Sequence, residues 1–403
     1  MAKKNKRIFY PDQPVPTESF VGRASQVHTL MEFGVAPALE GSPKAMFIRG
    51  EYGLGKSSLA SYVQSRAEEK DQVYGIYASL SGAYTLPELA RTIVRSAMEK
   101  AERQASLDRA TTGLVQEVKS AAAVLTATRV AVRQEETVPT QETSTHVELL
   151  NFLRKLQGKL FTSHTRAIVL ILDEIDMLAP ERVFAPFVKG LMDTNAIHSE
   201  RLPLLLLVCG VRRCWQQMLQ AHPSIERVFE TVEIPPMSLE ESEEFYRRSF
   251  AAGSIDVSKE AIKVFHAHSG GVPRIMHLLG EKAYRADKDH FVDLQDAMVA
   301  TTQAAQDYGE GFIRERIREI LHTRTELIII HRIGKLNRDK PRFVIDDMTT
   351  GLSEAEREKL PQFLDNLVQL EILRPGETRD EYEFCLPIVQ LYFWLVAKNN
   401  LRL

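Results

Sequence analysis

Short apolar runs alternate with amphipathic stretches from about residue 45 to residue 236 of the 403-residue chain. The apolar runs are "AMFIRG", "QVYGIYASL", "RAIVLILDEID", "LPLLLLVCG" and the shorter "FETVEIPP". Helical patterns such as "KSSLASYVQSRAEE" and "TLPELARTIVRSAMEKAER" lie between them. Continuous apolar strands separated by helices are typical of βαβ units, in which helices cover both faces of a parallel sheet. The pattern therefore predicts an α/β domain with a buried parallel sheet.

The pattern changes in three other segments. Residues 101–145 are rich in Ala, Thr, Gln and Glu, which predicts a helical insertion with a flexible part; it would either contact a partner or form a mobile surface excursion. Residues 238–307 have a helical pattern throughout, as expected of a helical lid. From residue 310, a helix, a turn, a helix and two short strands around "PGETRDE" have the layout of a winged helix. The expected domains are a basic N-terminal arm (1–15), an α/β nucleotide-binding domain (16–237), a helical lid (238–307) and a winged helix (310–403).

Composition and charge exclude several classes of protein. Hydrophobic residues make up 44% of the chain and charged residues 26%, with a net charge of -3, which indicates a globular protein and gives no global reason to expect nucleic acid. The start, "MAKKNKRIFYPDQP", lacks the apolar segment of a secretory signal, and the apolar runs are too short to span a bilayer. Cys209, Cys214 and Cys385 have no paired zinc spacing. We therefore expect a cytoplasmic protein, with Cys209 and Cys214 as buried thiols.

A glycine-rich segment, "GEYGLGKS", fits G-x-x-x-x-G-K-[ST] at every fixed position. It follows a buried strand and opens a helix, which favours a phosphate-binding loop over the alternative of a structural glycine turn. Backbone N–H groups and the positive end of the helix would face the phosphates. Lys56 would reach the β- and γ-phosphates of ATP, and the Ser57 hydroxyl would ligate Mg²⁺. The predicted nucleotide-binding residues of this segment are Gly50, Glu51, Tyr52, Gly53, Leu54, Gly55, Lys56, Ser57 and Ser58.

An acidic pair ends the apolar strand "IVLILDEID". Carboxylates at the carboxyl end of such a strand lie where ligands of parallel sheets bind. Asp173 would hold Mg²⁺, and Glu174 would polarise the attacking water as general base. Asp176 is expected to make structural contacts. The presence of both Asp173 and Glu174 favours hydrolysis of the nucleotide over binding alone.

Two arginines are candidates for stabilising charge on the phosphates. Arg274 follows "SGGVP" at a helix start, where it would either contact the γ-phosphate or form a salt bridge. Arg227 precedes the last strand of the sheet and would act as an arginine finger supplied to a neighbouring subunit. Arg212 and Arg213 compete with Arg227 for this role.

These motifs, in this order, resemble the AAA+ ATPase superfamily over residues 16–307. "ESFVGR" resembles the segment that packs on the adenine in the branch of origin-recognition initiators and STAND ATPases, which implies that Phe20 and Val21 contact the nucleotide. The motifs also resemble those of bacterial secretion-associated and transposition-regulator ATPases. "SGGVPRIMHLL" and the segment before it are similar to sensor 2 and the lid, so the resemblance gives Arg274 the sensor 2 role and Arg227 the finger role. "LLLLVCGVRRCW" departs from the family, because no polar sensor 1 residue follows the fourth strand.

The resemblance implies an ATP hydrolase that works as a molecular switch. Mg²⁺-ATP bound between subunits would favour a homo-oligomer that engages DNA or a partner protein such as a helicase or transposition protein, and hydrolysis would release it. A basic run would add to DNA contact; it consists of Arg332, Lys335, Arg338, Lys340 and Arg342.

The composition of the predicted winged helix opposes DNA binding. Residues 310–403 hold 15 Lys and Arg against 16 Asp and Glu. The helix "SEAEREKLPQFLDNL" would repel phosphate, and Pro361 falls inside it. A STAND-type signalling or antiviral defence ATPase, whose winged helix docks an effector protein, is therefore the alternative.

Overall fold

The computed structural model describes residues 7–107, 142–160, 165–336, 342–378 and 380–399. The chain divides into two compact units, which are described separately. The first, called the sheet unit, is Pro14–Pro235. The second, called the helical unit, joins the start of the chain, through Gln13, to the part from Pro236 onward. The division at residues 235–236 lies close to the predicted boundary at 237.

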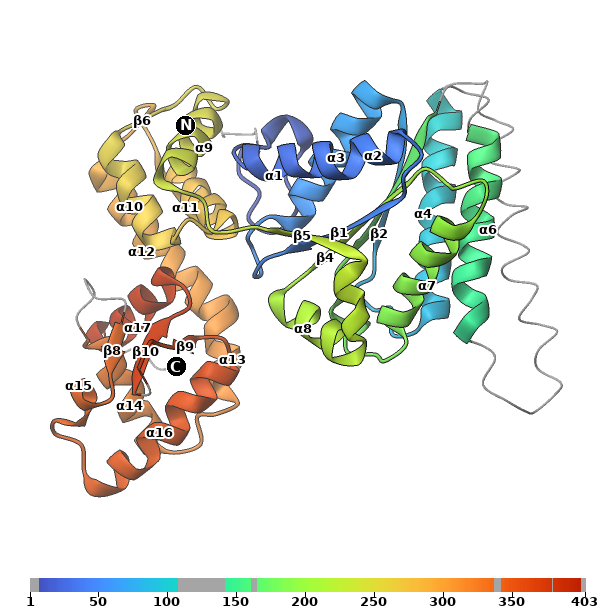
Figure 1. Ribbon diagram of the computed structural model, residues 1–403. Helices are drawn as coiled ribbons and strands as arrows, with labels where there is room; N and C mark the ends of the chain where they lie inside the picture. Colours follow the sequence, from blue (N-terminus) through green and yellow to red (C-terminus); the bar gives the residue numbers. More distant parts are fainter. Residues whose placement is uncertain (1–6, 108–141, 161–164, 337–341, 379, 400–403) are drawn as a thin grey trace. The chain divides into compact units, whose positions relative to one another are not determined.

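A five-stranded parallel sheet is the centre of the sheet unit, with the strand order β2-β3-β4-β1-β5 (Figure 1). Every residue of β3 and of β4 is buried, because both faces of the sheet are covered. This confirms the α/β fold that the apolar runs predicted. The strands are β1 (Lys44–Arg49), β2 (Val73–Ser79), β3 (Ala167–Asp173), β4 (Leu204–Gly210) and β5 (Phe229–Glu233).

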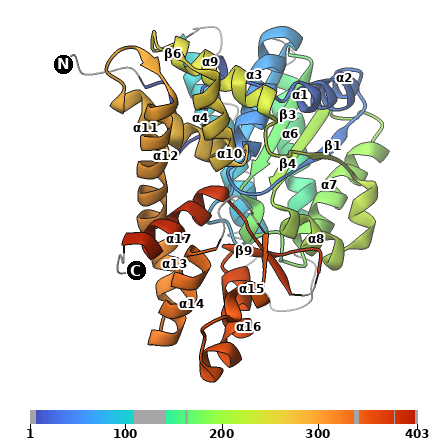
Figure 2. The same ribbon diagram turned by 90° about the vertical axis from the view of Figure 1, so that its left-hand side faces the viewer.

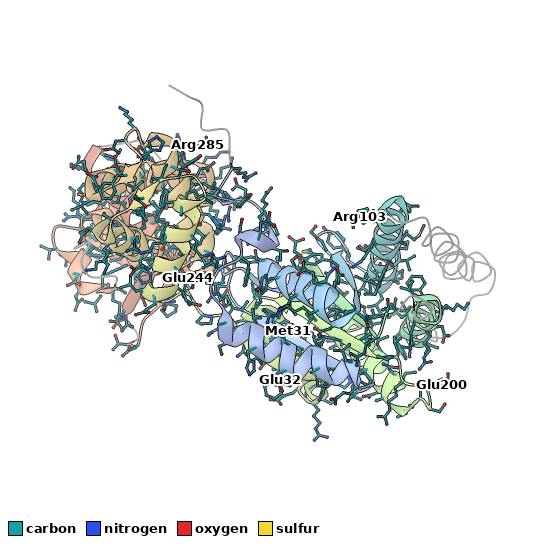
Figure 3. The ribbon with its side chains drawn as sticks, turned by 90° about the horizontal axis from the view of Figure 1, so that it is seen from above. Met31, Glu32, Arg103, Glu200, Glu244 and Arg285 are labelled. Carbon is teal, nitrogen blue, oxygen red and sulfur yellow. The ribbon has the colours of Figure 1, made fainter. Side chains whose placement is uncertain are left out.

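Helices cover both faces of this sheet. On one face, α4, α6 and α7 join alternate strand residues such as Phe47 and Leu170 in a single apolar core. On the other face lie α3 and the series α1, η2 and α2; Figure 3 looks onto this layer, where Met31 and Glu32 mark η2. The helices are α1 (Ala24–Thr29), the π-helical η2 (Leu30–Val35), α2 (Ala36–Leu39), α3 (Lys56–Asp71), α4 (Leu86–Leu107), α6 (Glu142–Leu160), α7 (Phe184–Ile197) and α8 (Arg212–Ala221), with the short 3₁₀ turns η1 (Thr17–Ser19), η6 (Ile175–Met177) and η7 (Pro223–Arg227).

The predicted insertion at 101–145 falls largely outside the described residues. Its first residues extend α4 and its last residues begin α6, so these two helices flank it. Cys209 and Cys214 are buried, as expected, and the three cysteines are free thiols. None of the described helices is both long and apolar enough to cross a membrane.

The start of the chain is built into the core of the helical unit. Phe9 is 1% exposed and meets Phe250 edge-on, with ring centroids 5.0 Å apart. A Cβ at Gly280 would come within 2.3 Å of the Phe9 ring, so glycine is needed for this contact. The Tyr10 backbone N–H donates to His277 Nδ1 at 3.2 Å. The part of the predicted N-terminal arm from residue 7 to residue 13 therefore packs as one of the elements of this unit.

The C-terminal part of the helical unit contains three antiparallel strands with the order β8-β10-β9. The strand β8 adds to the two predicted strands, because Phe343 packs on Tyr382 and Phe384 of β10. The helix α17 packs along α12 and α14 (Figure 2). The elements are α9 (Leu239–Ala251), β6 (Asp256–Val257), α10 (Lys259–Ser269), α11 (Pro273–Ala286), β7 (Phe291–Val292), α12 (Leu294–Tyr308), the π-helical η8 (Gly309–Ile313), α13 (Arg314–Arg318), α14 (Arg324–Gly334), β8 (Arg342–Val344), α15 (Asp346–Thr349), α16 (Glu354–Gln369), β9 (Leu373–Pro375), β10 (Glu381–Phe384) and α17 (Pro387–Asn399). These are the elements that a winged helix requires, and that assignment stays a prediction.

Candidate nucleotide-binding site

The glycine-rich loop connects β1 to α3, as the sequence predicted. Gly53 and Gly55 have φ angles of 80° and 92°, a backbone conformation that other L-residues rarely adopt. At Gly50, a Cβ would lie 3.0 Å from the Ile234 carbonyl oxygen. A side chain at any of these three positions would therefore strain the backbone or crowd a neighbouring atom.

The Lys56 side chain lies back over the loop. Its ammonium donates to the carbonyl oxygens of Gly50 at 2.9 Å and Glu51 at 3.1 Å. It also lies 5.4 Å from the centre of the Tyr52 ring. Burial lowers the pKa of Lys56, while nearby groups that include Asp173 oppose this shift. The only partners recorded for the ammonium among the described residues are therefore neutral.

Arg23 supports the loop, although the sequence analysis did not select it. Its side chain is 3% exposed and donates to the carbonyl oxygens of Leu54 at 3.2 Å and Pro235 at 2.6 Å. It follows Gly22, and both residues have positive φ angles immediately before α1. The only sequence feature that indicated this supporting role is an arginine beside a glycine at the start of a helix.

The segment predicted to meet the adenine lies against α3. Phe20 stacks on Tyr62 of that helix, with ring centroids 4.3 Å apart and an angle of 15° between the planes. Val21 is buried. Just before this segment, the Val15 backbone N–H donates to the Ser58 hydroxyl at 3.2 Å. The residues predicted to contact adenine therefore lie beside the helix that follows the phosphate loop, and their contact with a nucleotide stays a prediction.

The acidic pair stands at the carboxyl end of β3, where two hydroxyls of β2 meet it. Asp173 is 4% exposed; its Oδ1 accepts from the Glu174 N–H at 2.9 Å, and its Oδ2 accepts from the Tyr77 hydroxyl. The Glu174 carboxylate accepts from the Ser79 hydroxyl. Neither hydroxyl was selected from the sequence, because β2 carries no recognisable motif. Each acid is thus bonded to a neutral side chain of the neighbouring strand.

Asp176 makes the structural contacts expected of it. Its Oδ1 accepts from the Tyr52 hydroxyl at 2.7 Å and is 3.4 Å from the Cys214 Sγ. Burial raises the pKa of Cys214 to about 12, and the charge of Asp176 adds to this shift. The contact with Tyr52 connects the tip of the phosphate loop to the turn that follows β3.

The strand register brings the loop and the acidic pair to the same edge of the sheet. β4 lies between β1 and β3, with Cys209 opposite Ile48 and Val208 opposite Leu172. The residues that follow β1 and β3 therefore emerge together, separated by a single strand. This juxtaposition includes Lys56, Ser57, Asp173 and Glu174.

The donor atoms at this edge suit Mg²⁺. A hydroxyl and a carboxylate are hard oxygen donors, which Mg²⁺ prefers, and it usually takes one or two protein ligands together with phosphates and waters. Ser57 and Asp173 provide this set, and the Tyr77 hydroxyl donates to the Asp173 carboxylate. Over the described parts of the chain, no group of three or more His, Cys, Asp or Glu residues forms a denser metal site.

Arg227 lies at the opposite edge of the sheet. It is exposed at the end of η7, two residues before β5 begins. β5 runs parallel to β1, with Phe229 opposite Ala45 and Glu233 opposite Arg49. At about 3.3 Å per residue, the start of β5 is roughly 15 Å from the edge that bears the phosphate loop. Arg227 is therefore not brought to the phosphate loop of its own chain.

The other arginines have different surroundings. Arg212 donates to Glu233 at 3.0 and 2.5 Å, and Glu233 also accepts from Arg49 at 2.5 Å. Arg213, next to it, is exposed. In the helical unit, the guanidinium of Arg274 lies 4.5 Å from the centre of the Phe312 ring. Among the described residues Arg274 forms no salt bridge, which was the alternative to a contact with the γ-phosphate.

Comparisons with known proteins agree with this arrangement. Residues 19–206 match the AAA ATPase domain family. The chain is similar to the Walker-type ATPase PABY2304 of Pyrococcus abyssi, with 17% identity, a TM-score of 0.57 and coverage of 96% of this chain and 99% of that chain. It is also similar to the ORC2 protein of Aeropyrum pernix, solved as ADPNP-ADP complexes, with 15% identity, a TM-score of 0.59 and coverage of 98% and 97%. No match was found among curated proteins. The chain therefore has the P-loop AAA+ fold, and its residues 19–206 match the AAA ATPase domain family.

Proposed function

We propose that the chain binds ATP with Mg²⁺ at the edge where the phosphate loop meets the acidic pair, and hydrolyses it to ADP and phosphate. The observation that carries this proposal is the juxtaposition of Lys56, Asp173 and Glu174 across a single strand. The match to the AAA ATPase domain family supports the same reaction.

Lys56 and the first turn of α3 would bind the phosphates. The ammonium now bonds to two neutral carbonyl oxygens, and the charged oxygens of a phosphate are stronger acceptors. The N-terminus of α3 adds a positive partial charge at the same place. Ser57 and Asp173 would hold Mg²⁺, which neutralises charge on the phosphates when it is bound.

Glu174 would act as the general base for the attacking water. Its carboxylate now accepts a hydrogen bond from Ser79, so one of its oxygens is occupied. Rotation of the side chain away from Ser79 would free the carboxylate for the water. The bond to Ser79 would therefore slow hydrolysis until that rotation occurs.

Arg227 would complete the site of a neighbouring subunit in a homo-oligomer. Because it lies at the edge opposite its own phosphate loop, its guanidinium is available to a second copy of the chain. Arg274 would contact the γ-phosphate from the lid and so couple nucleotide state to assembly. An ATP-dependent oligomer would then engage DNA through the winged helix and the basic run.

A second candidate, docking of a partner protein, is favoured by the ion pairs of the C-terminal region. Arg342 bonds to Glu377 at 2.8 Å and lies 3.6 Å from Glu383, which also pairs with Arg374 at 3.0 Å. Arg332 donates to the Gly351 carbonyl at 3.2 Å. Lys335 is exposed, and Arg338 and Lys340 lie outside the described residues. Much of the described basic run is therefore neutralised or bonded within the protein, which leaves less positive charge for DNA.

Nucleotide binding is tested with Lys56→Ala. We expect calorimetry to show ATP binding by the wild type and none by the variant, because the phosphates lose their principal cation. Lys70→Ala, at the exposed far end of the same helix, is the matched control and should bind like the wild type. Equal ATP affinity in the Lys56→Ala protein and the wild type would refute the phosphate-loop assignment.

The trans role of Arg227 is tested by mixing inactive variants. Lys56→Ala and Arg227→Ala proteins should each lack ATPase activity, and their mixture should regain part of it at mixed interfaces. The same assay with Arg212→Ala and Arg213→Ala decides among the three arginines. A mixture as inactive as its components would remove the finger role from the variant tested.

Engagement of DNA is tested by fluorescence anisotropy with duplex DNA at several salt concentrations. Binding that strengthens with ATP and weakens steeply with salt would support the DNA role. Absence of binding at low salt, with ATP and with ADP, would reject that role and leave the docking of a partner protein.

A further inference from the structure

The strand β2 presents two tyrosines to opposite faces of the sheet. Tyr74 is part of the apolar core with α4, and its hydroxyl donates to the Ala97 carbonyl at 3.3 Å. Tyr77 is three positions along and faces the side of α3, as Ser79 does, because side chains alternate along a strand. It is half-buried and reaches the end of β3. Asp173 is therefore bonded to a residue that belongs neither to the phosphate loop nor to the acidic pair.

The Tyr77 hydroxyl supports one of the residues predicted to ligate Mg²⁺ and lies near the other. It donates to the Asp173 Oδ2. The Ser57 hydroxyl is close enough to act on the pKa of Tyr77. Because the proton of Tyr77 is directed at the carboxylate, the lone pairs of its oxygen face other donors.

This arrangement suits a requirement of cation binding. A hydroxyl that ligates a cation uses an oxygen lone pair and needs an acceptor for its proton. The Tyr77 oxygen, near Ser57, would be such an acceptor. Asp173 is almost fully buried, and a buried carboxylate needs donors to hold it in one orientation. Its Oδ1 has the Glu174 N–H, and its Oδ2 has Tyr77.

We propose that Tyr77 is a positioning residue for the divalent cation of the nucleotide complex. It orients the Ser57 hydroxyl and the Asp173 carboxylate before the cation binds, and so sets the Mg²⁺ concentration that the complex requires. The inference rests on the proposed function, because it needs a nucleotide at the phosphate loop. Hydrogen-bonded partners of metal ligands typically contribute about 10- to 100-fold to metal affinity.

The test compares Tyr77→Phe with the wild type in a calorimetric titration of the ADP-loaded protein with Mg²⁺. We expect the half-saturating Mg²⁺ concentration to rise about 10-fold. Affinity for ADP in EDTA should stay unchanged, because the phenol bonds to a predicted cation ligand, and no hydrogen bond among the described residues joins it to the loop carbonyls that bind Lys56. Tyr74→Phe is the matched control: it removes a hydroxyl from the opposite face of the same strand and should leave both values unchanged.

A double-mutant cycle keeps the proposal testable if β2 is loosened by the substitution. Ser57→Ala, Tyr77→Phe and the double variant should be non-additive. The double variant should bind Mg²⁺ more weakly than Ser57→Ala, but by less than the two separate losses combined, because Tyr77 acts through Ser57 as well as through Asp173. Fully additive effects would overturn the proposal, as would a Tyr77→Phe protein with the Mg²⁺ requirement of the wild type. An equal rise in Tyr74→Phe would assign the effect to general loosening of the strand. A wild type that binds no nucleotide would refute the proposed function itself, which is a different result.

Discussion

Charged groups have different partners in the two units of this chain. At the phosphate-loop edge of the sheet unit, Lys56 bonds to carbonyl oxygens, while Asp173 and Glu174 bond to hydroxyls. In the C-terminal part of the helical unit, Arg342 and Arg374 bond to carboxylates. A neutral partner leaves the charge available to a ligand, whereas an opposite charge cancels it. The side chains at the phosphate-loop edge therefore favour a charged ligand, whereas Arg342 and Arg374 already have acidic partners within the protein.

One group at the sheet edge is ion-paired: Glu233 binds both Arg49 and Arg212. Its carboxylate accepts from both arginines at the ends of neighbouring strands. Burial opposes a low pKa for Glu233, but the hydrogen bonds from the two arginines lower it overall. Ion pairs of the sheet unit thus occur near the phosphate loop as well as on its helices, while the proposed reacting groups themselves have neutral partners.

The largest effect is expected from Glu174→Gln. The amide keeps the size of the side chain but cannot accept a proton, so ATP turnover should fall about 10²- to 10⁴-fold while ATP binding is retained. Turnover is measured by phosphate release and binding by calorimetry. Glu181→Gln, an exposed acid a few residues further along, should behave like the wild type. Undiminished turnover in Glu174→Gln would show that another group is the base.

The helical unit should lose stability in acid because of His277. Burial, with Arg7 nearby, lowers the pKa of His277 to about 3, and its Nδ1 accepts a backbone N–H. The unfolded chain therefore takes up a proton below about pH 6.5 that the folded unit does not. Stability falls with pH over this window by about 1.4 kcal/mol per unit, or about 2 kcal/mol between pH 7 and pH 5.

The measurement for His277 is denaturant unfolding at pH 7 and pH 5, followed by the fluorescence of Trp394 in the same unit. His277→Gln should remove most of the pH dependence, although it lowers stability at pH 7. His322→Gln, at an exposed position, is the control. The same acid sensitivity in His277→Gln and the wild type would show that other groups titrate.

A smaller effect is expected from Glu383→Gln, which removes an acidic partner in the C-terminal region and so makes it more like the phosphate-loop edge. Removing this carboxylate frees Arg374, while Arg342 keeps its pair with Glu377. If the C-terminal region contacts DNA, affinity should rise by up to about 10-fold and the salt dependence should steepen by roughly one phosphate contact. Glu358→Gln removes the same charge from an exposed position that makes no ion pair among the described residues, and should change affinity less. Equal effects of the two substitutions would show that these pairs do not restrict DNA binding.

The smallest effect is expected from Ser79→Ala. Loss of this hydroxyl frees the Glu174 carboxylate, so basal ATP turnover should rise a few-fold, in line with the loss of one hydrogen bond of about 1 kcal/mol. Ser42→Ala, which removes an exposed hydroxyl before β1, is the control. Lower turnover in Ser79→Ala would mean that the bond holds Glu174 in its working position.

The sequence by itself determined the parallel sheet, the phosphate loop and the acidic pair. Each is encoded in contiguous residues: continuous apolar strands, glycines at positions with positive φ, and carboxylates directly after a buried strand. The spacing of apolar residues along the chain and the steric requirements of the backbone determine such features locally. The resemblance of the same motifs to AAA+ ATPases was confirmed by the match over residues 19–206.

Only the tertiary structure decided which residues support the site and which charges are cancelled. Tyr77 and Ser79 meet the acids because β2 pairs with β3 in one register, Arg23 reaches the phosphate loop from before α1, and Phe9 packs against helices more than two hundred residues away. The pairing of Arg342 and the strand β8 likewise depend on contacts between distant segments. Such contacts leave no periodic or contiguous pattern, because strand register and side-chain packing are settled only when the whole unit folds.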